Sequence, residues 1–96
     1  KDPILRQEAA LTLSQIGPDS SIAVEALLPL LDDPVRSVQL AAAFSVSSLG
    51  PDGKRATGRL EQMLSSDDHL SRLVGARGLA TLGEVRPGIA EKIVEI

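Results

Sequence analysis

Residues 38–50 read VQLAAAFSVSSLG and are the middle copy of a pattern that occurs three times in the 96-residue chain. The first copy, residues 5–17, reads LRQEAALTLSQIG, and the third, residues 71–83, reads SRLVGARGLATLG. The closing glycines, Gly17, Gly50 and Gly83, are separated by two equal steps of 33 residues. A period of this length indicates helical repeat units, which cannot bury their apolar faces alone and stack on their neighbours.

Helix-start and helix-stop signals divide the first copy into two helices. Asp2 can cap free backbone amides and Pro3 fits a first helical turn. Apolar and small residues then recur at helical spacing as far as Ile16, and Gly17 followed by proline ends the helix. A second helix should follow, in which Pro29 bends or frays the last turn. Its apolar face consists of Ala23, Leu27, Leu30 and Leu31.

The same signals recur in the other two copies. The middle copy has two extra residues before Gly50, so its first helix, which follows Pro34, is expected to begin a half-turn early. In the third copy, Gly75 stands where the others have alanine, which predicts a close approach of backbones. The apolar positions of the middle second helix are Ala56, Leu60, Met63 and Leu64. Those of the last helix, which opens at Pro87, are Ile89, Ile93 and Ile96.

These patterns predict an all-α chain built from three helix–turn–helix units. The units span residues 1–32, 33–65 and 66–96, and together they form one segment, residues 1–96. Because the chain opens at Lys1 without a methionine, we interpret it as part of a longer array.

Composition excludes several classes of function. There is no cysteine, which removes disulfides and thiolate metal sites, and Phe44 is the only aromatic residue besides His69, which weighs against base-stacking platforms. The net charge is −3, which argues against attraction to nucleic acids or anionic membranes. No apolar run approaches the roughly 18 residues of a membrane span. The compartment is left open, with the cytoplasm favoured over secretion.

The recurring pattern, aliphatic-Arg-x-x-Ala-Ala-x-x-Leu-small-x-Ile/Leu-Gly, resembles the HEAT repeat, and in particular the short HEAT-like units also found in phycobilisome lyase subunits. It departs from the family at Gln39, where arginine is preferred, and at Ser71 and His69. The resemblance covers essentially all 96 residues and implies an α-solenoid, a right-handed superhelix whose second helices line the concave side. The residues that carry it are Leu5, Arg6, Ala9, Ala10, Leu13, Ile16, Gly17, Val38, Ala42, Ala43, Val46, Leu49, Gly50, Arg72, Ala76, Leu79, Leu82 and Gly83.

The second helices carry the candidate contact residues for a partner. Lys54, Arg55 and Arg59 form the only basic cluster, which could contact an acidic peptide or phosphate or could be an ordinary solvated face. If the family geometry holds, equivalent positions of the three second helices form ladders along the concave surface. These ladders are Glu25, Gly58, Glu91; Ala26, Arg59, Lys92; and Pro29, Gln62, Glu95.

Other polar residues have structural interpretations. Arg6 and Arg72 are expected to pair with acids such as Asp2 or Asp68, or with loop carbonyls. His69 lies beside acidic residues, but a dedicated zinc site needs three or four ligands, so we favour an exposed histidine at a helix start. A nucleophile could be sought among Ser45, Ser47 and Ser48, yet no base accompanies them in their unit. We therefore expect no catalytic residues, no metal and no cofactor.

These observations favour a protein–protein interaction or scaffolding module that presents a concave helical surface. An alternative is a non-catalytic accessory or chaperone-type subunit of a bilin-lyase-like enzyme, which would need an open apolar groove for a tetrapyrrole. Binding to a nucleic-acid backbone is disfavoured by the acidic pI of about 5.0. The last helix has no polar cap, so self-association through Ile89, Ile93, Val94 and Ile96 is also expected.

Overall fold

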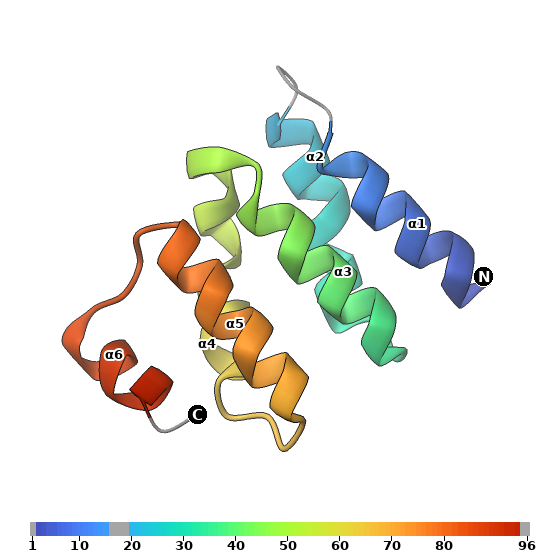
Figure 1. Ribbon diagram of the computed structural model, residues 1–96. Helices are drawn as coiled ribbons and strands as arrows, with labels where there is room; N and C mark the ends of the chain where they lie inside the picture. Colours follow the sequence, from blue (N-terminus) through green and yellow to red (C-terminus); the bar gives the residue numbers. More distant parts are fainter. Residues whose placement is uncertain (1, 16–19, 95–96) are drawn as a thin grey trace.

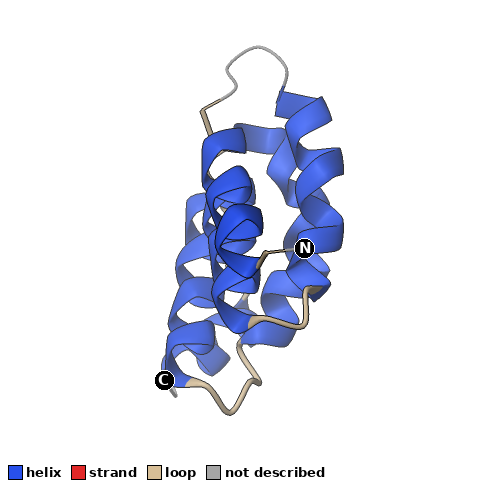
Figure 2. Cartoon of the chain, turned by 90° about the vertical axis from the view of Figure 1, so that its right-hand side faces the viewer, coloured by secondary structure: helices blue, strands red, loops and turns tan. Residues whose placement is uncertain are grey.

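The computed structural model describes residues 2–15 and 20–94, and within these ranges the only regular structure is helical (Figure 2). The prediction of an all-α chain is confirmed. In chain order the elements are α1 (Pro3–Leu13), α2 (Ser20–Leu27), the 3-10 helix η1 (Leu28–Asp32), α3 (Arg36–Ser47), the 3-10 helix η2 (Gly50–Ala56), α4 (Thr57–Met63), α5 (His69–Thr81) and α6 (Pro87–Val94).

The helices form two layers. In Figure 1, α1, α3 and α5 lie side by side in one row, with α3 packed against both of its neighbours. The second layer lies behind this row and contains α2, η1, η2 and α4. Within and between the layers, η1 packs on α3, α2 meets η2, and α4 packs on α5. α6 follows the turn after α5 at the C-terminal end of the molecule.

The first helices begin at Pro3, Arg36 and His69, in steps of 33 residues. The expectation that the middle helix begins a half-turn early is wrong. Val35 is extended, with φ −99° and ψ 122°, and the Asp33 carboxylate accepts the Val35 N–H at 2.9 Å. The extra residues therefore lie in an extended link before α3, and the helix starts stay in register.

Local signals account for most of the helix boundaries. Asp2 caps α1 by accepting the Ile4 N–H at 2.8 Å, as predicted. The α-helical geometry of α2 ends at Leu27 and the 3-10 helix η1 begins at Leu28, one residue before Pro29, which confirms the expected disturbance near the proline. Gly83 has φ +73°, which an L side chain adopts at a cost, and the N–H of the next residue closes the turn onto the Leu79 carbonyl at 2.9 Å. Gly17 lies outside the described residues.

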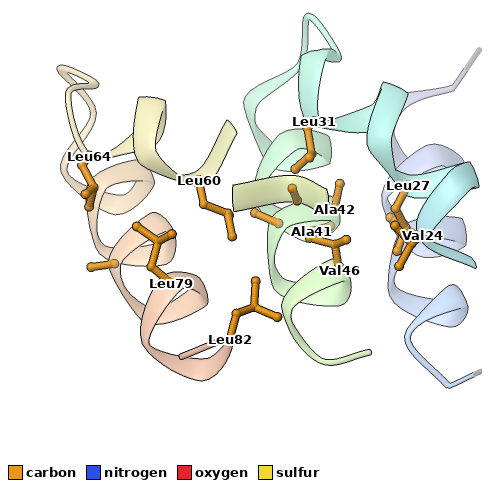
Figure 3. Packing of buried hydrophobic residues seen from close by; sticks show 14 of the residues in the cluster. Val24, Leu27, Leu31, Ala41, Ala42, Val46, Leu60, Leu64, Leu79 and Leu82 are labelled. Carbon is orange, nitrogen blue, oxygen red and sulfur yellow. The ribbon is translucent and has the colours of Figure 1, made fainter. Parts of the chain in front are cut away.

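The core repeats with the same 33-residue register. Ala10, Ala43 and Ala76 are buried at one equivalent position of the first helices, and Leu27 and Leu60 are fully buried at another position of the second helices. Figure 3 shows the leucines of α4 and α5 pointing toward one another across the two layers. The small residues Ala41, Ala42 and Ala43 of the middle copy are thus packing positions between helices.

Gly75 lies where α5 crosses α4 closely, as the sequence predicted. A Cβ atom at this position would lie 2.8 Å from the Leu60 carbonyl oxygen and 2.8 Å from the Met63 Cβ. The Leu60 oxygen is a backbone atom and the Met63 Cβ is bonded directly to the backbone, so neither can move aside without moving α4. The two helices can therefore approach this closely only with glycine at residue 75. Within the described residues, no helix combines the length and apolarity required to cross a membrane.

Candidate functional site

The predicted partner-contact residues lie on the elements that form the second layer and on α6, and we call them the second-helix surface. All eight that the structure describes are exposed. They are Glu25 on α2, Pro29 on η1, Lys54 and Arg55 on η2, Arg59 and Gln62 on α4, and Glu91 and Lys92 on α6. Glu95 lies outside the described residues.

The basic cluster of this surface is ion-paired rather than free. Arg55 pairs with Glu25 of α2 at 3.0 Å, and Lys54 pairs with Glu84, after α5, at 3.5 Å. Arg59 pairs with Asp32 at the end of η1. The cations of the middle unit therefore reach acids of the units on both sides. The cations are exposed and only Glu84 among the acids is half-buried, so each pair contributes at most about 1 kcal/mol and its main effect is to fix side-chain positions.

A polar pocket of about 280 Å³ opens at one end of this surface. Arg59 stands at its edge, where it also contacts the Gln62 side chain at 3.3 Å. The Gln39 side-chain amide, which lines the pocket from α3, donates to the Asp33 carbonyl. The remaining lining residues are Leu31, Asp32, Met63, Ser66 and Ser71. The pocket thus presents amide, hydroxyl, carboxylate and guanidinium groups, and its lining residues come from all three predicted units.

Arg6 forms a two-point ion pair with Asp33, and the predicted acid Asp2 contributes only a weaker electrostatic attraction to it. Its Nε lies 2.7 Å from one carboxylate oxygen and its terminal nitrogen 3.0 Å from the other, a two-point contact between α1 and the link before α3. The sequence analysis missed Asp33 as the main partner because the stacking of α3 on α1 brings it to Arg6, whereas the Asp2 side chain caps α1. The pair joins two units and is not part of the second-helix surface.

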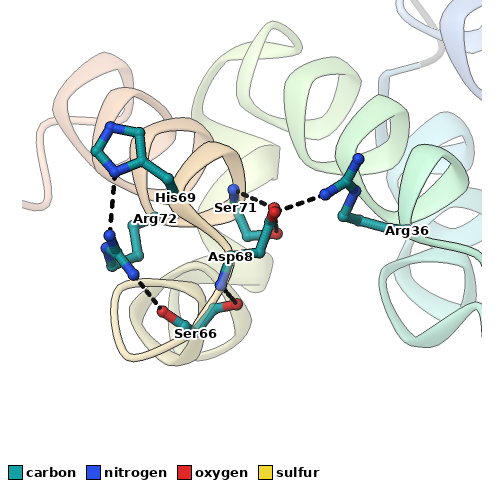
Figure 4. Close-up of polar contacts among 6 residues, drawn as sticks. All are labelled: Arg36, Ser66, Asp68, His69, Ser71 and Arg72. Carbon is teal, nitrogen blue, oxygen red and sulfur yellow. Dashed lines mark hydrogen bonds and ion pairs between the residues drawn. The ribbon is translucent and has the colours of Figure 1, made fainter.

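Asp68 is held by contacts from two units (Figure 4). One of its carboxylate oxygens accepts the Ser71 N–H at 2.8 Å and the Ser71 hydroxyl at 2.7 Å, so Asp68 caps α5. The other oxygen pairs with Arg36 at the start of α3. Arg36 rather than Arg72 is therefore the partner of Asp68, and this too corrects the sequence analysis.

The Arg72 guanidinium takes the other predicted option and donates to the Ser66 carbonyl at 2.9 Å. It also contacts the His69 Nδ1 at 3.0 Å, which places the histidine at an exposed helix start beside an arginine (Figure 4). Among residues 2–15 and 20–94, no group of three or more His, Asp or Glu side chains is arranged to hold a metal ion.

Ser45 and Ser47 are buried in α3, whereas Ser48, the residue after the helix, is exposed. The hydroxyls of Ser47 and Ser48 donate to the carbonyls of Ala43 and Phe44 in their own helix, at 2.7 and 2.9 Å. The Ser45 hydroxyl is fully buried and has no hydrogen-bond partner in the structure. None of the three hydroxyls is hydrogen-bonded to a described acid or to His69.

The terminal helix presents less apolar surface than the sequence predicted. Ile89 belongs to the buried core, with 6% of its surface exposed, and is not available for self-association. Ile93 is half-buried against the core, whereas Val94 is exposed. Ile96 lies outside the described residues.

The ion pair between Arg6 and Asp33 predicts how stability depends on pH. Hydrogen bonding to Arg6, and then to the Val35 N–H, holds the pKa of Asp33 below its usual value, and Ser71 does the same for Asp68. A carboxyl whose pKa is lower in the folded state stabilises the fold above its unfolded pKa of about 3.9. This stabilisation is lost as pH falls through the folded pKa, so the free energy of unfolding should decrease below about pH 4.

Urea denaturation at a series of pH values checks this expectation. Asp33→Asn should be less stable than the original protein at neutral pH, and the difference should shrink as the pH falls below about 4. Asp67→Asn, at an exposed position one residue before the helix cap, is the matched control and should follow the original curve. A constant difference between Asp33→Asn and the original protein at all pH values would contradict the assignment.

Comparison of the chain with protein-family models, with curated proteins and with solved structures finds no match. The surface is therefore interpreted from its own residues.

Proposed function

We propose that this chain is a HEAT-like α-solenoid segment that binds a protein or peptide partner through the second-helix surface. The first helices begin 33 residues apart, which supports a repeat architecture, whereas the second helices α2, α4 and α6 begin at Ser20, Thr57 and Pro87 and do not keep that spacing. The observation that carries the proposal is that all eight described residues of that surface are exposed. Two of them, Arg59 and Gln62, also line a polar pocket of about 280 Å³.

The side chains of this surface are arranged before any partner arrives. Arg59 is held by both Asp32 and Gln62, and Arg55 is held by Glu25. Holding a side chain in place reduces the conformational entropy that binding must remove, at about 0.5–1.5 kcal/mol for each long side chain. The half-exposed guanidinium groups keep donors available for acidic or amide groups of a partner. The mechanism we propose is rigid presentation of this mixed-charge surface.

Selection from a random-peptide display library on the immobilised protein tests this function. The selected peptides should bind the double variant Gln62→Ala/Glu91→Ala about tenfold more weakly, a loss that corresponds to about 1.4 kcal/mol. Glu8→Ala, an exposed change on α1, alters the net charge by the same amount and should leave binding unchanged. Failure to select any binder, or binders insensitive to the double variant, would contradict the proposal.

A further inference from the structure

A second groove lies between α3 and α5, on the row of first helices, and shares no lining residue with the polar pocket. Its volume is about 330 Å³. The floor lies where Gly78 faces Ser47, since a Cβ at residue 78 would come within 2.5 Å of the Ser47 hydroxyl. This close approach of the two helices leaves the larger side chains on either side as the walls.

The walls are apolar and open to solvent. Phe44 is 60% exposed, and Leu70 and Leu73 are 46% and 40% exposed. Large apolar side chains that gather in one exposed place are characteristic of surfaces that bind another molecule. Single exposed residues elsewhere need no such explanation, but here a phenylalanine and two leucines line one concave site.

The polar groups that line this groove are already satisfied, with one exception. The hydroxyls of Ser47, Ser48 and Thr81 each donate to a carbonyl of their own helix. Arg77 is the only charged side chain in the lining. Within the part of the chain that the structure describes, its guanidinium forms no ion pair or hydrogen bond, whereas every other described arginine contacts a carboxylate or a carbonyl.

We propose that this groove binds a short acidic amphipathic segment of a partner protein. A large aliphatic or aromatic side chain of the segment occupies the space between Phe44, Leu70 and Leu73, and a neighbouring carboxylate pairs with Arg77. Complementary charge identifies the acidic residue, because Arg77 is the one lining group left without a counter-charge. The volume, at the lower end of the roughly 300–1,000 Å³ of ligand pockets, suits a few side chains of a peptide.

Nuclear magnetic resonance titration tests the proposal, and Phe44 makes the readout unusually clear. The chain contains one phenylalanine, one histidine and no tyrosine or tryptophan. The only aromatic ring signals in its proton spectrum are therefore those of Phe44 and His69. The probes are a set of synthetic amphipathic peptides with a Leu-x-x-Leu core. Each peptide of the set carries a single glutamate, at a different position beside the core. A matched set carries lysine in place of glutamate.

At least one glutamate peptide should shift the Phe44 ring signals, and its lysine counterpart should bind about tenfold more weakly. Arg77→Gln should weaken binding of the glutamate peptide by a similar factor, whereas Arg77→Lys should retain most of that binding. Arg77→Glu should bind the lysine peptide more tightly than the glutamate peptide. Ser21→Glu, an exposed change on α2, alters the net charge by the same amount as Arg77→Gln and should have no effect.

Three results would overturn the proposal. The first is that no peptide of either set shifts the Phe44 signals at millimolar concentration. The second is that lysine and glutamate peptides bind with equal affinity, and the third is that Arg77→Gln binds the glutamate peptide as tightly as the original protein does. Tighter binding of the linear tetrapyrrole biliverdin at the Phe44 ring than of any peptide would assign the groove to a pigment instead. Because the second-helix surface is unchanged in these variants, failure here leaves the proposed function of that surface standing.

Discussion

Leu60→Ala is expected to lower the free energy of unfolding by about 2–5 kcal/mol, because the removed methyl groups leave a cavity that the helices refill only in part. Leu60 is fully buried on α4, and its methyl carbons lie next to Gly78 of α5. It therefore holds the second layer against the first. A domain of this size has a total stability of about 5–15 kcal/mol, so this variant should be largely unfolded at moderate urea concentrations.

Urea denaturation followed by far-ultraviolet circular dichroism measures this loss. Ile22→Ala is the matched control, since Ile22 is also an aliphatic residue of the second layer but is 67% exposed. Its stability should change by no more than about 0.5 kcal/mol. Equal denaturation midpoints for the two variants would show that Leu60 is not packed between α4 and α5 in solution.

Gly53→Ala should destabilise the protein by about 1–3 kcal/mol although it adds only one methyl group, because the site has no room for it. A Cβ at residue 53 would lie 2.2 Å from the Val46 carbonyl oxygen, which belongs to the backbone of α3, and 3.2 Å from a methyl carbon of Leu82. A backbone atom cannot turn aside as a side chain can. The 3-10 helix η2 must therefore move away from α3.

Gly58→Ala is the control for this prediction. It lies on α4, where an added Cβ meets nothing within 4 Å, and alanine favours a helix over glycine by about 0.5–1 kcal/mol. The same denaturation experiment should thus show opposite signs for the two glycine-to-alanine changes. If Gly53→Ala is as stable as Gly58→Ala, the close contact between η2 and α3 does not exist in solution.

Signals that act over a few residues predicted most of the fold. Asp2 and Asp68 cap the helices they precede, Gly50 and Gly83 adopt positive φ, and the small residue Gly75 marks a close crossing. The caps and the positive φ angles depend on one residue and its immediate neighbours, so the sequence pattern contains them. Gly75 differs, because the glycine indicates a close approach but the atoms that it approaches, in Leu60 and Met63 of α4, are distant in the sequence. The error at Pro34 has the same origin, because proline permits a helix start without requiring one.

Contacts between units could not be predicted from the 33-residue alignment. Arg59 pairs with Asp32, 27 residues earlier, and Arg86 pairs with Glu61, 25 residues earlier. A long arginine side chain reaches back along the neighbouring unit, so its partner is offset from the aligned position. Searching for opposite charges at separations somewhat shorter than the repeat would have found both pairs. The exposure of Phe44 was also missed, since it stands within an otherwise buried apolar run.

The ion pairs across the second layer mean that the three units are not interchangeable. In a tandem array made only of copies of the middle unit, each copy would supply its own residues at the positions that hold Glu25, Asp32 and Glu84 in this chain. In the 33-residue alignment these residues are Gly58, Ser65 and Pro51, none of which is acidic. Every lysine and arginine of the cluster would then lose its counter-ion. The charges of the middle unit therefore match only its own two neighbours in the chain. A uniform array designed from this unit alone would need new acidic residues at each junction between units.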